Sequence, residues 1–402
     1  MTFDPALLTF AEPAHLWLEV SQTEIDRAWQ RSQSFSSNRD RWNAYLNQIC
    51  LNTVLDWIKQ EYAPQANVWS IATLPSIWEV VNGSAITLDK TRFVLVPTEA
   101  IDFSELRLPQ EWVDIPSWAA DYYLAASVDP DEGLVRIWGY ATHRQIKQKA
   151  SYDPQDRTYC LDEADLQDIS VLWVSRQLCP QDMTRSAIAP LPKMALAQAE
   201  NLIARLGTPD IINPRLAVPF ALWGALLEHG GWRQNLYHRR MGYPEQWSVL
   251  QWLSGGVSEA AKQFGWGQIG WQPSLAAARG TTQIPTEVFL SRHLTIAGQN
   301  YELRVIPRGT EQQRIWRFEL RNARSGDRIP GGFRLRLLTE DLQPFDGNQD
   351  VATTATDYLF VDVVLEPGEG LVWEVEPMPK NYINKQIIGG SGSYILVAIK
   401  RL

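Results

Sequence analysis

The sequence has 402 residues, 45% hydrophobic and 21% charged, which is typical of soluble globular proteins and long enough for two or three domains. A formal net charge of −9 at pH 7 argues against general affinity for nucleic acids or anionic membranes. The three cysteines, Cys50, Cys160 and Cys179, form no C-x-x-C pair, which argues against a zinc site or a disulfide framework and is typical of the cytoplasm.

The N-terminal part is predicted to be a mixed α+β domain over residues 1–190. It opens without a basic region before an apolar core, and no apolar stretch is long enough to cross a bilayer, so we expect no signal peptide and no membrane insertion. Apolar side chains at helical spacing predict a helix over residues 39–62. Short alternating runs broken by turn residues predict antiparallel strands from residue 68 to about 140, and residues 162–178 favour a helix.

Residues 191–272 are predicted to form a helical block packed on that domain. Apolar periodicity indicates helices over residues 193–206, 219–229, 231–241 and 244–264. The first three are each followed by a glycine suited to a left-handed helix end, at Gly207, Gly230 and Gly242.

The stretch FGWGQIGWQP, residues 264–273, has glycines spaced as G-x-G-x-x-G, like a dinucleotide-binding turn. In that fold the first glycine follows a strand and the third begins a helix. Here a predicted helix comes first and Trp-Gln-Pro follows, so we interpret the stretch as a helix end and a turn, and we predict no cofactor. Trp266 and Trp271 then either close the core at the domain junction, which we favour, or belong to a contact surface.

Tryptophan is concentrated before the C-terminal domain, since sixteen of the eighteen lie at or before Trp271. Tryptophan fills cores and is also enriched at interface hot spots. We favour a core role, with a shared contact surface as the alternative, for Trp112, Trp118, Trp247 and Trp252.

Residues 285–402 are predicted to form an antiparallel β-sandwich, because short segments alternate apolar and polar side chains. The expected strands cover residues 287–296, 301–307, 314–321, 332–338, 358–368, 370–377 and 393–399. The expected inward side chains are Trp316, Phe318, Leu320, Phe333, Leu335, Leu337, Leu359, Val361, Val363, Leu365, Leu371, Trp373 and Val375.

Charges are divided unevenly within this domain. Residues 301–336 contain nine arginines and four acids, whereas residues 337–376 contain ten acids and no basic residue. We favour pairing across strands on the outer face. The expected pairs involve Arg317, Arg321, Arg334 and Arg336 opposite Asp362, Glu374 and Glu376. Alternatively the two charge sets occupy separate faces, and these arginines then belong to an interface with another protein.

A second basic cluster lies in HGGWRQNLYHRRMG, residues 229–242, where no acid separates the basic side chains. Clustered arginine and histidine can hold a phosphate or carboxylate group. The candidate residues for binding an anion or an acidic partner are Arg233, His238, Arg239 and Arg240. In the alternative that we favour, part of this helix packs on the core and the other basic groups are solvated or complement the helix dipole.

Motifs of common enzymes are missing. The five histidines are scattered, and the sequence contains no H-E-x-x-H, no G-x-S-x-G and no G-x-x-x-x-G-K-[ST]. We therefore expect no metal site and favour a protein without catalytic activity. Active sites can assemble from residues far apart in sequence, so an uncharacterised enzyme stays an alternative.

Several segments follow one another in an informative order: YLNQICLNTVLDWIKQE, WEVVNGSAITLDKTRFVLVP, LVRIWGYATH, WSVLQWL, FGWGQIGWQP and NYINKQIIGG. Together they resemble the cyanobacterial family named only as domain of unknown function 1822, over most of the chain. The resemblance implies a cyanobacterial cytoplasmic protein with no established activity, and it transfers no catalytic residue to this chain.

We predict a non-enzymatic regulatory or adaptor protein whose C-terminal β-sandwich contacts an unidentified protein partner. A second hypothesis is a sensor or enzyme that binds a small molecule or anion where the helical block meets the strands, using Arg233, His238 and Arg240. A third, nucleic-acid binding by the arginine-rich strands, is disfavoured by the net charge. A flat exposed face would support the first hypothesis and a deep pocket the second.

Overall fold

The computed structural model describes residues 14–69, 73–99, 105–179, 183–242, 266–271, 287–308, 315–324, 326–339, 344–365 and 371–377. The chain divides into two compact units, Met1–Tyr243 and Pro244–Leu402. The described residues contain nine α-helices and several largely antiparallel sheets, so the predicted mixture of α and β structure is confirmed. Within these ranges no helix is both long and apolar enough to cross a membrane.

The first unit is built around a six-stranded sheet with the strand order β1-β7-β6-β4-β3-β2. Its strands are β1 (Leu16–Glu19), β2 (Asn67–Val68), β3 (Ser84–Leu88), β4 (Thr91–Thr98), β6 (Tyr122–Asp129) and β7 (Leu134–Thr142). The expectation of antiparallel strands is wrong at the centre of the sheet, where β4 and β6 are parallel. A parallel pair needs a long crossover, and here the connecting chain contains β5 (Glu105–Pro109) and α5 (Gln110–Asp114).

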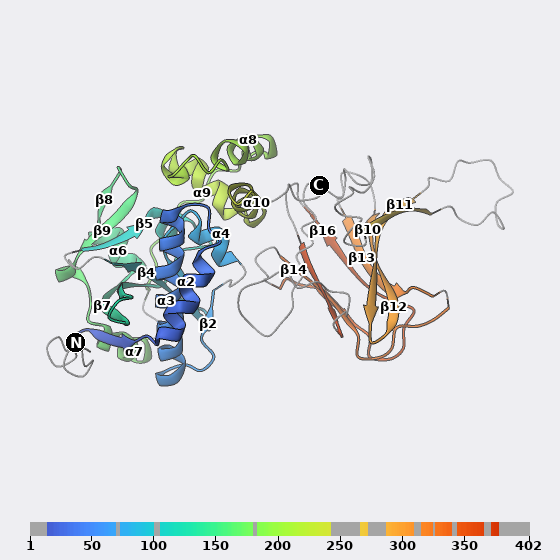
Figure 1. Ribbon diagram of the computed structural model, residues 1–402, viewed down its shortest axis with the longest axis horizontal. Coiled ribbons are helices and arrows are strands. Elements are labelled where there is room, and N and C mark those ends of the chain that lie inside the picture. The colour runs from blue at the N-terminus through green and yellow to red at the C-terminus, as the bar shows by residue number, and fades with distance from the viewer. Residues whose placement is uncertain are drawn as a thin grey trace. The chain divides into compact units, whose positions relative to one another are not determined.

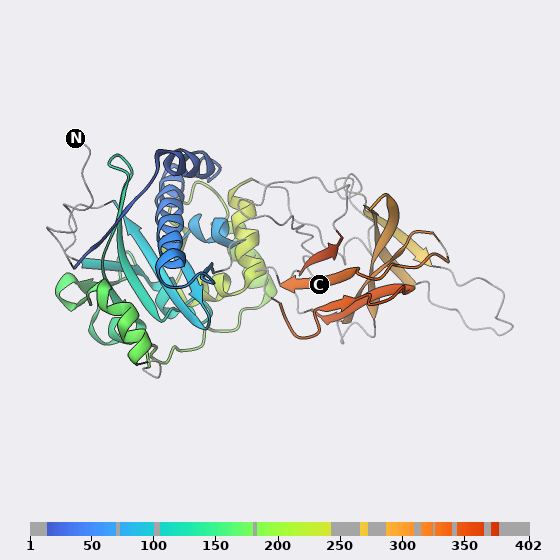
Figure 2. The ribbon, with the colours of Figure 1, turned by 90° about the horizontal axis from the view of Figure 1, so that it is seen from below.

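Helix α3 (Asn38–Glu61) packs on this sheet and confirms the helix predicted over residues 39–62. Figures 1 and 2 show it lying against the strands, beside the shorter α2 (Gln22–Ser32). The side chain of Ser37 accepts a hydrogen bond from the backbone N–H of Asp40 and so caps the first turn. Most of the apolar face seen in the sequence is buried, including Tyr45, Leu46, Ile49, Cys50, Val54, Leu55 and Ile58, whereas Trp42 and Tyr62 are exposed.

A three-stranded sheet, β5-β9-β8, lies in the same unit and is formed with β8 (Ser151–Asp153) and β9 (Thr158–Asp162). The helix predicted over residues 162–178 is shorter than expected. β9 continues to Asp162, a 3₁₀ helix covers Glu163–Asp165, and α7 (Ile169–Leu178) begins only after Asp168. The side chain of Asp168 accepts a hydrogen bond from the backbone N–H of Ser170, which fixes that start. The other helices here are α4 (Leu74–Trp78) and α6 (His143–Lys149).

Three helices lie together in Figure 1 and complete the first unit. They are α8 (Leu196–Leu206), α9 (Phe220–Glu228) and α10 (Gly230–Arg240). They confirm three of the four helices predicted from residue 193 onward. The fourth, which would carry Trp247 and Trp252, falls outside the described residues.

The glycines after these helices behave differently from one another. Gly242 has the predicted left-handed conformation, with a φ of 65°. Gly207 ends α8 with a right-handed φ of −76°, and Gly230 begins α10 directly after α9. The expectation of left-handed ends is therefore wrong at Gly207 and Gly230.

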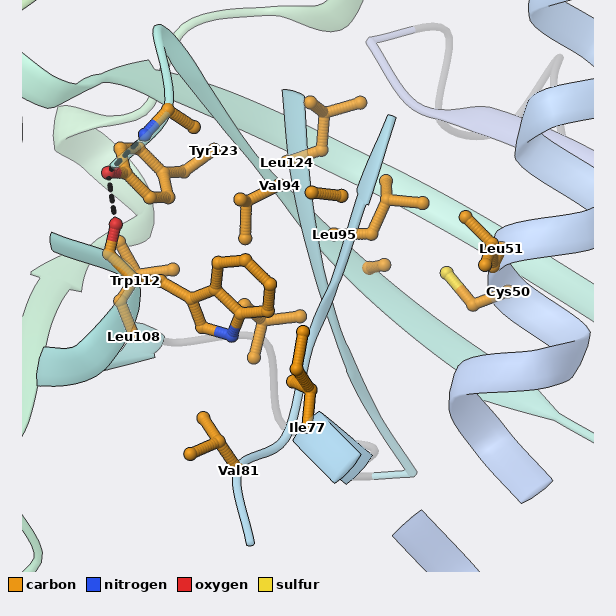
Figure 3. Close-up of a cluster of buried hydrophobic side chains, with 14 of the residues drawn as sticks. Cys50, Leu51, Ile77, Val81, Val94, Leu95, Leu108, Trp112, Tyr123 and Leu124 are labelled. Atoms are coloured by element: carbon orange, nitrogen blue, oxygen red, sulfur yellow. Dashed lines mark hydrogen bonds between the residues drawn. The ribbon is translucent and has the colours of Figure 1, made fainter. Parts of the chain in front are cut away.

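Trp112 lies within the large buried cluster of the first unit (Figure 3). Trp112 and Trp118 are both 0% exposed, so the core role favoured for them is confirmed. The indole Nε1 of Trp112 donates a hydrogen bond to the carbonyl oxygen of Asn82 at 2.9 Å. The next residue, Gly83, has a φ of 123°, and a Cβ there would lie 2.4 Å from that nitrogen. Glycine is therefore required for the backbone to approach the ring.

The second unit contains two antiparallel sheets, with the orders β10-β11-β12-β13-β16 and β15-β14-β17. The strands are β10 (Trp266–Trp271), β11 (Glu287–Ile296), β12 (Gln299–Arg308), β13 (Ile315–Asn322), β14 (Arg334–Thr339), β15 (Gln349–Val351), β16 (Tyr358–Val364) and β17 (Leu371–Glu376). Six strands predicted by alternation are confirmed, and the one expected over residues 393–399 lies outside the described residues. Both sheets contribute to one apolar cluster, which contains twelve of the thirteen inward side chains predicted above; Val363 is only partly buried and packs against the cluster.

The stretch interpreted as a turn is strand β10. Its residues pair with β11 in register, from Trp266 opposite Arg292 to Trp271 opposite Glu287. The expectation that its glycines end the helical block is therefore wrong, because the strand belongs to the larger sheet of the second unit. Its local sequence could not show this, since pairing with a later segment defines the strand.

We expect Tyr123→Phe to destabilise the first unit. The Tyr123 hydroxyl donates a hydrogen bond to the carbonyl oxygen of Trp112 at 2.7 Å and accepts one from the backbone N–H of Ala120 at 3.2 Å (Figure 3). Removing it leaves two buried backbone groups without this partner, which should lower the free energy of unfolding by about 1–3 kcal/mol in urea denaturation. The control is Tyr152→Phe, which removes a hydrogen bond to Gln110 from a side chain that is 42% exposed. Equal losses in the two variants would contradict this account.

Candidate functional site

The four basic side chains predicted to bind an anion do not converge. Arg233 and Arg240 are each only 2% exposed, whereas Arg239 is exposed. His238 is half-buried, with its Nε2 2.8 Å from the amide nitrogen of Gln234. Anion or acidic-partner binding stays a prediction, but two of its four residues serve inside the protein.

Arg233 is held by groups of the first unit. Its Nη1 donates a hydrogen bond to the carbonyl oxygen of Leu227 at 2.7 Å, and its Nε donates to the Ser76 hydroxyl at 3.3 Å. Its guanidinium carbon lies 5.6 Å from the ring centroid of Trp118. Arg233 therefore ties α10 to α4 and to the tryptophan core.

The guanidinium of Arg240 is buried between two carboxylates. Its Nε donates a hydrogen bond to Glu79 Oε1 at 2.7 Å, and its Nη2 lies 3.5 Å from Asp40 Oδ2. A further donation, from Nη1, reaches the carbonyl oxygen of Ile211 at 3.1 Å. Glu79 also accepts hydrogen bonds from the hydroxyl and the backbone N–H of Ser36. Arg240 thus joins α10 to the start of α3 and the end of α4.

Burial raises the pKa of Glu79 and of Asp40 above ordinary carboxyl values. Burial is the largest cause in each case. A hydrogen bond from Ser37 lowers the pKa of Asp40, hydrogen bonds from Ser36 lower that of Glu79, and the charge of Arg240 lowers both. One guanidinium serves two carboxylates, so full ionisation would leave a net negative charge in a buried place.

A second buried ion pair joins α5 to the 3₁₀ helix η3 (Pro214–Leu216). Arg215 binds Glu111 through two hydrogen bonds, Nε to Oε1 at 2.9 Å and Nη2 to Oε2 at 2.7 Å. The indole nitrogen of Trp223 also donates to Glu111 Oε1, at 2.7 Å. Glu111 is 0% exposed, so its charge is matched inside the core. Sequence reasoning missed this pair; its one sequence signal is an acid embedded in the apolar segment LPQEWVDIP.

A cavity of about 230 Å³ lies where η3 meets β4, β5 and the start of α3. The hypothesis of a sensor or enzyme predicted a small-molecule pocket of this kind, where the helical block meets the strands. Its wall includes Asp40 and Glu79 from the first ion cluster and Arg215 from the second. The remaining polar lining consists of Arg39, Asn43, Asn82, Arg107, Asp156, Thr158 and Asn213.

The charges around this cavity are largely matched within the protein. Arg107 donates hydrogen bonds to Asp156 at 2.8 Å and to Asp153 at 2.9 Å. These carboxylates hold the pKa of Arg107 above its usual value. The expected residues Arg233, His238 and Arg240 are not among those lining the cavity. A binding role for these three residues elsewhere stays a prediction, although Arg233 and Arg240 are bound by other groups of the first unit.

In the second unit, cross-strand pairing is confirmed for three of the four arginines. Arg317 binds Asp362 through two hydrogen bonds of 2.7 Å, and these residues are opposite one another on β13 and β16. On β14, Arg334 lies 2.5 Å from Glu376 and Arg336 Nε donates to Glu374 at 2.7 Å. Arg321 departs from the prediction, since its partner is Glu319 of its own strand at 3.2 Å.

Among the described strands, β16 is the last of the larger sheet, and it has an unusual outer face. Leu359 and Val361 point into the core, whereas Tyr358, Phe360 and Val364 are 41%, 37% and 60% exposed. We call these three outward side chains the β16 face. The guanidinium carbon of Arg317 lies 4.0 Å from the ring centroid of Phe360 and so fixes that ring. Sequence reasoning missed this face because it considered only the inward positions of the strand.

Trp266 and Trp271, the other interface candidates, occupy the two ends of β10. This strand lies at the opposite end of the larger sheet from β16. The two tryptophans therefore do not belong to the β16 face, and their role in a contact stays a prediction.

No group of three or more His, Cys, Asp or Glu side chains in the described part of the chain is placed to hold a metal ion. The chain is thus a mixed α and β protein with buried ion clusters in its first unit and an exposed apolar strand face in its second. A family model described as protein of unknown function (DUF1822) matches residues 18–388, and the chain belongs to this family. The expected family membership is confirmed. No curated protein and no solved structure matches the chain.

We expect Asp40→Asn to change how stability depends on pH. Because burial raises the pKa of Asp40, the folded state holds this proton more tightly than the unfolded state. The resulting stabilisation is complete below pH of about 4 and is lost as the pH rises through the raised pKa. Between pH 4 and 7 the free energy of unfolding of the variant should therefore rise relative to the wild type. Urea denaturation across this range measures the difference. The control, Asp56→Asn on the exposed side of α3, should run parallel to the wild type; a parallel Asp40→Asn curve would contradict the prediction.

Proposed function

We propose that this protein is a non-enzymatic regulatory or adaptor protein that acts through protein–protein contacts made by the β16 face. The observation that carries the proposal is the exposure of Tyr358, Phe360 and Val364 on one side of a terminal strand. Exposed apolar side chains gathered on one surface commonly mark an interaction site, and here Asp362, which Arg317 binds, lies between Phe360 and Val364.

The residue types on this face support a role in binding. Tyrosine and arginine are enriched among side chains that dominate the energy of interfaces. Tyr358 and Phe360 have ring centroids 6.0 Å apart, and Arg317 lies over Phe360 while bound to Asp362. The aromatic rings are therefore braced before a partner arrives, which lowers the entropy cost of binding.

We propose further that the two sheets of the second unit form a β-sandwich that presents this face. Support comes from the apolar cluster to which both sheets contribute. Nucleic acid is not proposed as the partner, because Arg317, Arg334 and Arg336 already contact carboxylates.

The cytoplasm of a cyanobacterium is the proposed location. The three free cysteines support a reducing compartment, with Cys50 and Cys160 buried and Cys179 exposed. The cyanobacterial source rests on the family resemblance.

A single surface variant tests the interface. Phe360→Ser should lose a protein partner that the tagged wild-type chain captures reproducibly from its host, as measured by quantitative mass spectrometry. The physical reason is the loss of an exposed aromatic contact without damage to the core. The matched control is Tyr152→Ser, an exposed aromatic side chain on β8 of the first unit that lies on no proposed contact surface. Equal partner recovery with Phe360→Ser, or a co-purifying metabolite and no protein, would contradict the proposal.

A second candidate function is the binding of a small molecule in the charged cavity of the first unit. The observation that favours it is the position of the cavity between two buried ion clusters, with side chains of both charge signs and three asparagines on its wall. Such a lining suits a small ligand that carries both a positive and a negative group.

Filling the cavity tests this second function. Asn43→Phe places a larger side chain on the wall, and it should remove any small-molecule adduct found on the purified wild-type protein by native mass spectrometry. Asn52→Phe, farther along α3 and partly exposed, controls for the substitution itself. An adduct that survives Asn43→Phe, or a wild-type protein without any adduct, argues against ligand binding in this cavity.

A further inference from the structure

Helix α7 has two apolar faces, and one of them is exposed. Ile169, Leu172 and Trp173 are buried against the first unit. Val171, Val174 and Leu178 are 44%, 53% and 76% exposed. These three residues follow the i, i+3, i+7 spacing that places side chains along one side of a helix. We call Val171, Val174 and Leu178 the α7 ridge (the helix is labelled in Figure 1).

The buried side of the helix holds the ridge in place. The Trp173 ring stacks on Tyr62 with centroids 4.3 Å apart and an angle of 13° between the planes. Arg176 lies over the rings of Phe93 and Trp173, at 5.6 and 5.8 Å from their centroids. The ridge therefore projects from a fixed helix, so its side chains lose little conformational entropy when a partner binds.

The N-terminal end of the ridge is acidic. Residues 162–168 contain four acids and no basic residue. Asp165 is bound by Lys149 at 2.7 Å, whereas Asp162, Glu163 and Asp168 are exposed. Asp168 also caps the helix, so part of this charge complements the helix dipole. The exposed carboxylates make this end of the ridge attractive to cationic side chains.

The C-terminal end of the ridge adjoins a cavity of about 340 Å³. Ser175 and Cys179 of this segment line it together with Met183, which is 73% exposed. The opposite wall is polar, and there the Tyr140 hydroxyl donates a hydrogen bond to Gln167 at 2.8 Å. This volume is large enough to receive a partner's anchoring side chain beside the ridge.

We propose that the α7 ridge docks an amphipathic helix of a partner protein that has basic residues at one end. Its apolar side covers Val171, Val174 and Leu178, its basic end lies over residues 162–168, and one side chain enters the cavity beside Cys179. Helix-in-groove recognition uses this spacing of apolar anchors, and charge complementarity fixes the direction of the bound helix. This surface belongs to the first unit and does not depend on the β16 face.

A synthetic peptide tests the proposal on the full-length protein. The probe is a fluorescein-labelled helix with leucines along one side and lysines at one end, followed by fluorescence anisotropy. It should bind saturably, and Leu178→Ser should weaken it by about tenfold or more, because the contact of one large apolar side chain is lost. A matched peptide with glutamates in place of lysines should bind more weakly. The double variant Asp162→Asn with Glu163→Gln should reduce the difference in affinity between the two peptides.

Matched surface variants separate this site from the β16 face. Val364→Ser, 60% exposed on β16, should leave peptide binding unchanged. Phe360→Ser tests the proposed function and should also leave it unchanged, so the two proposals can fail independently. Val174→Ser provides a second ridge variant, and circular dichroism checks that each variant keeps its fold.

Several outcomes would overturn the docking proposal. Equal affinities of the lysine and glutamate peptides would contradict the proposed contact between residues 162–168 and the basic end of the partner helix. Unchanged peptide binding by Leu178→Ser and Val174→Ser would show that the α7 ridge is not the binding surface. Dimerisation of the wild type that Leu178→Ser abolishes, in sedimentation experiments, would identify a second copy of this chain as the occupant instead.

Discussion

The buried guanidinium of Arg240 is the interaction on which the first unit most depends. It connects α10 with Asp40 at the start of α3 and with Glu79 at the end of α4. A buried charge of this kind is tolerated because its partners are in place, and loss of one partner typically costs several kcal/mol. The Arg215–Glu111 pair makes a second such link, between η3 and α5. These links explain why the three C-terminal helices of the unit belong to the same compact body as the six-stranded sheet.

Several arginines that suggested a binding site in the sequence bind groups of the protein itself. The basic residues clustered in the sequence suggested an anion-binding site. In the structure, however, Arg233 donates hydrogen bonds to Leu227 and Ser76, and Arg240 donates one to Glu79. Arg317 of β13 and Arg334 and Arg336 of β14 likewise meet carboxylates of neighbouring strands. Most of the conspicuous positive charge in the chain therefore orders the fold, and apolar exposure is the better guide to its contacts.

The sequence predicted best what depends on local periodicity. The buried face of α3 and the inward residues of six strands follow directly from spacings of 3.6 and 2 residues. Features defined by distant partners could not be predicted in this way. The parallel pairing of β4 with β6, the pairing of β10 with β11 and the Arg215–Glu111 pair all join segments whose own sequences do not specify the partner. The ion cluster at Arg240 was missed for the same reason, since its acids lie more than a hundred residues away in the chain.

Both proposed contact surfaces lie on elements whose outward positions break the expected alternation. On β13 the outward residues Arg317, Glu319 and Arg321 are all charged, but on β16 two aromatic residues and a valine take such positions beside Asp362. On α7 a second apolar row stands opposite the row that packs on the sheet. Exposed apolar side chains contribute little to folding at these positions, yet here they lie on elements that the core holds in place. We propose that contact with another molecule accounts for both surfaces.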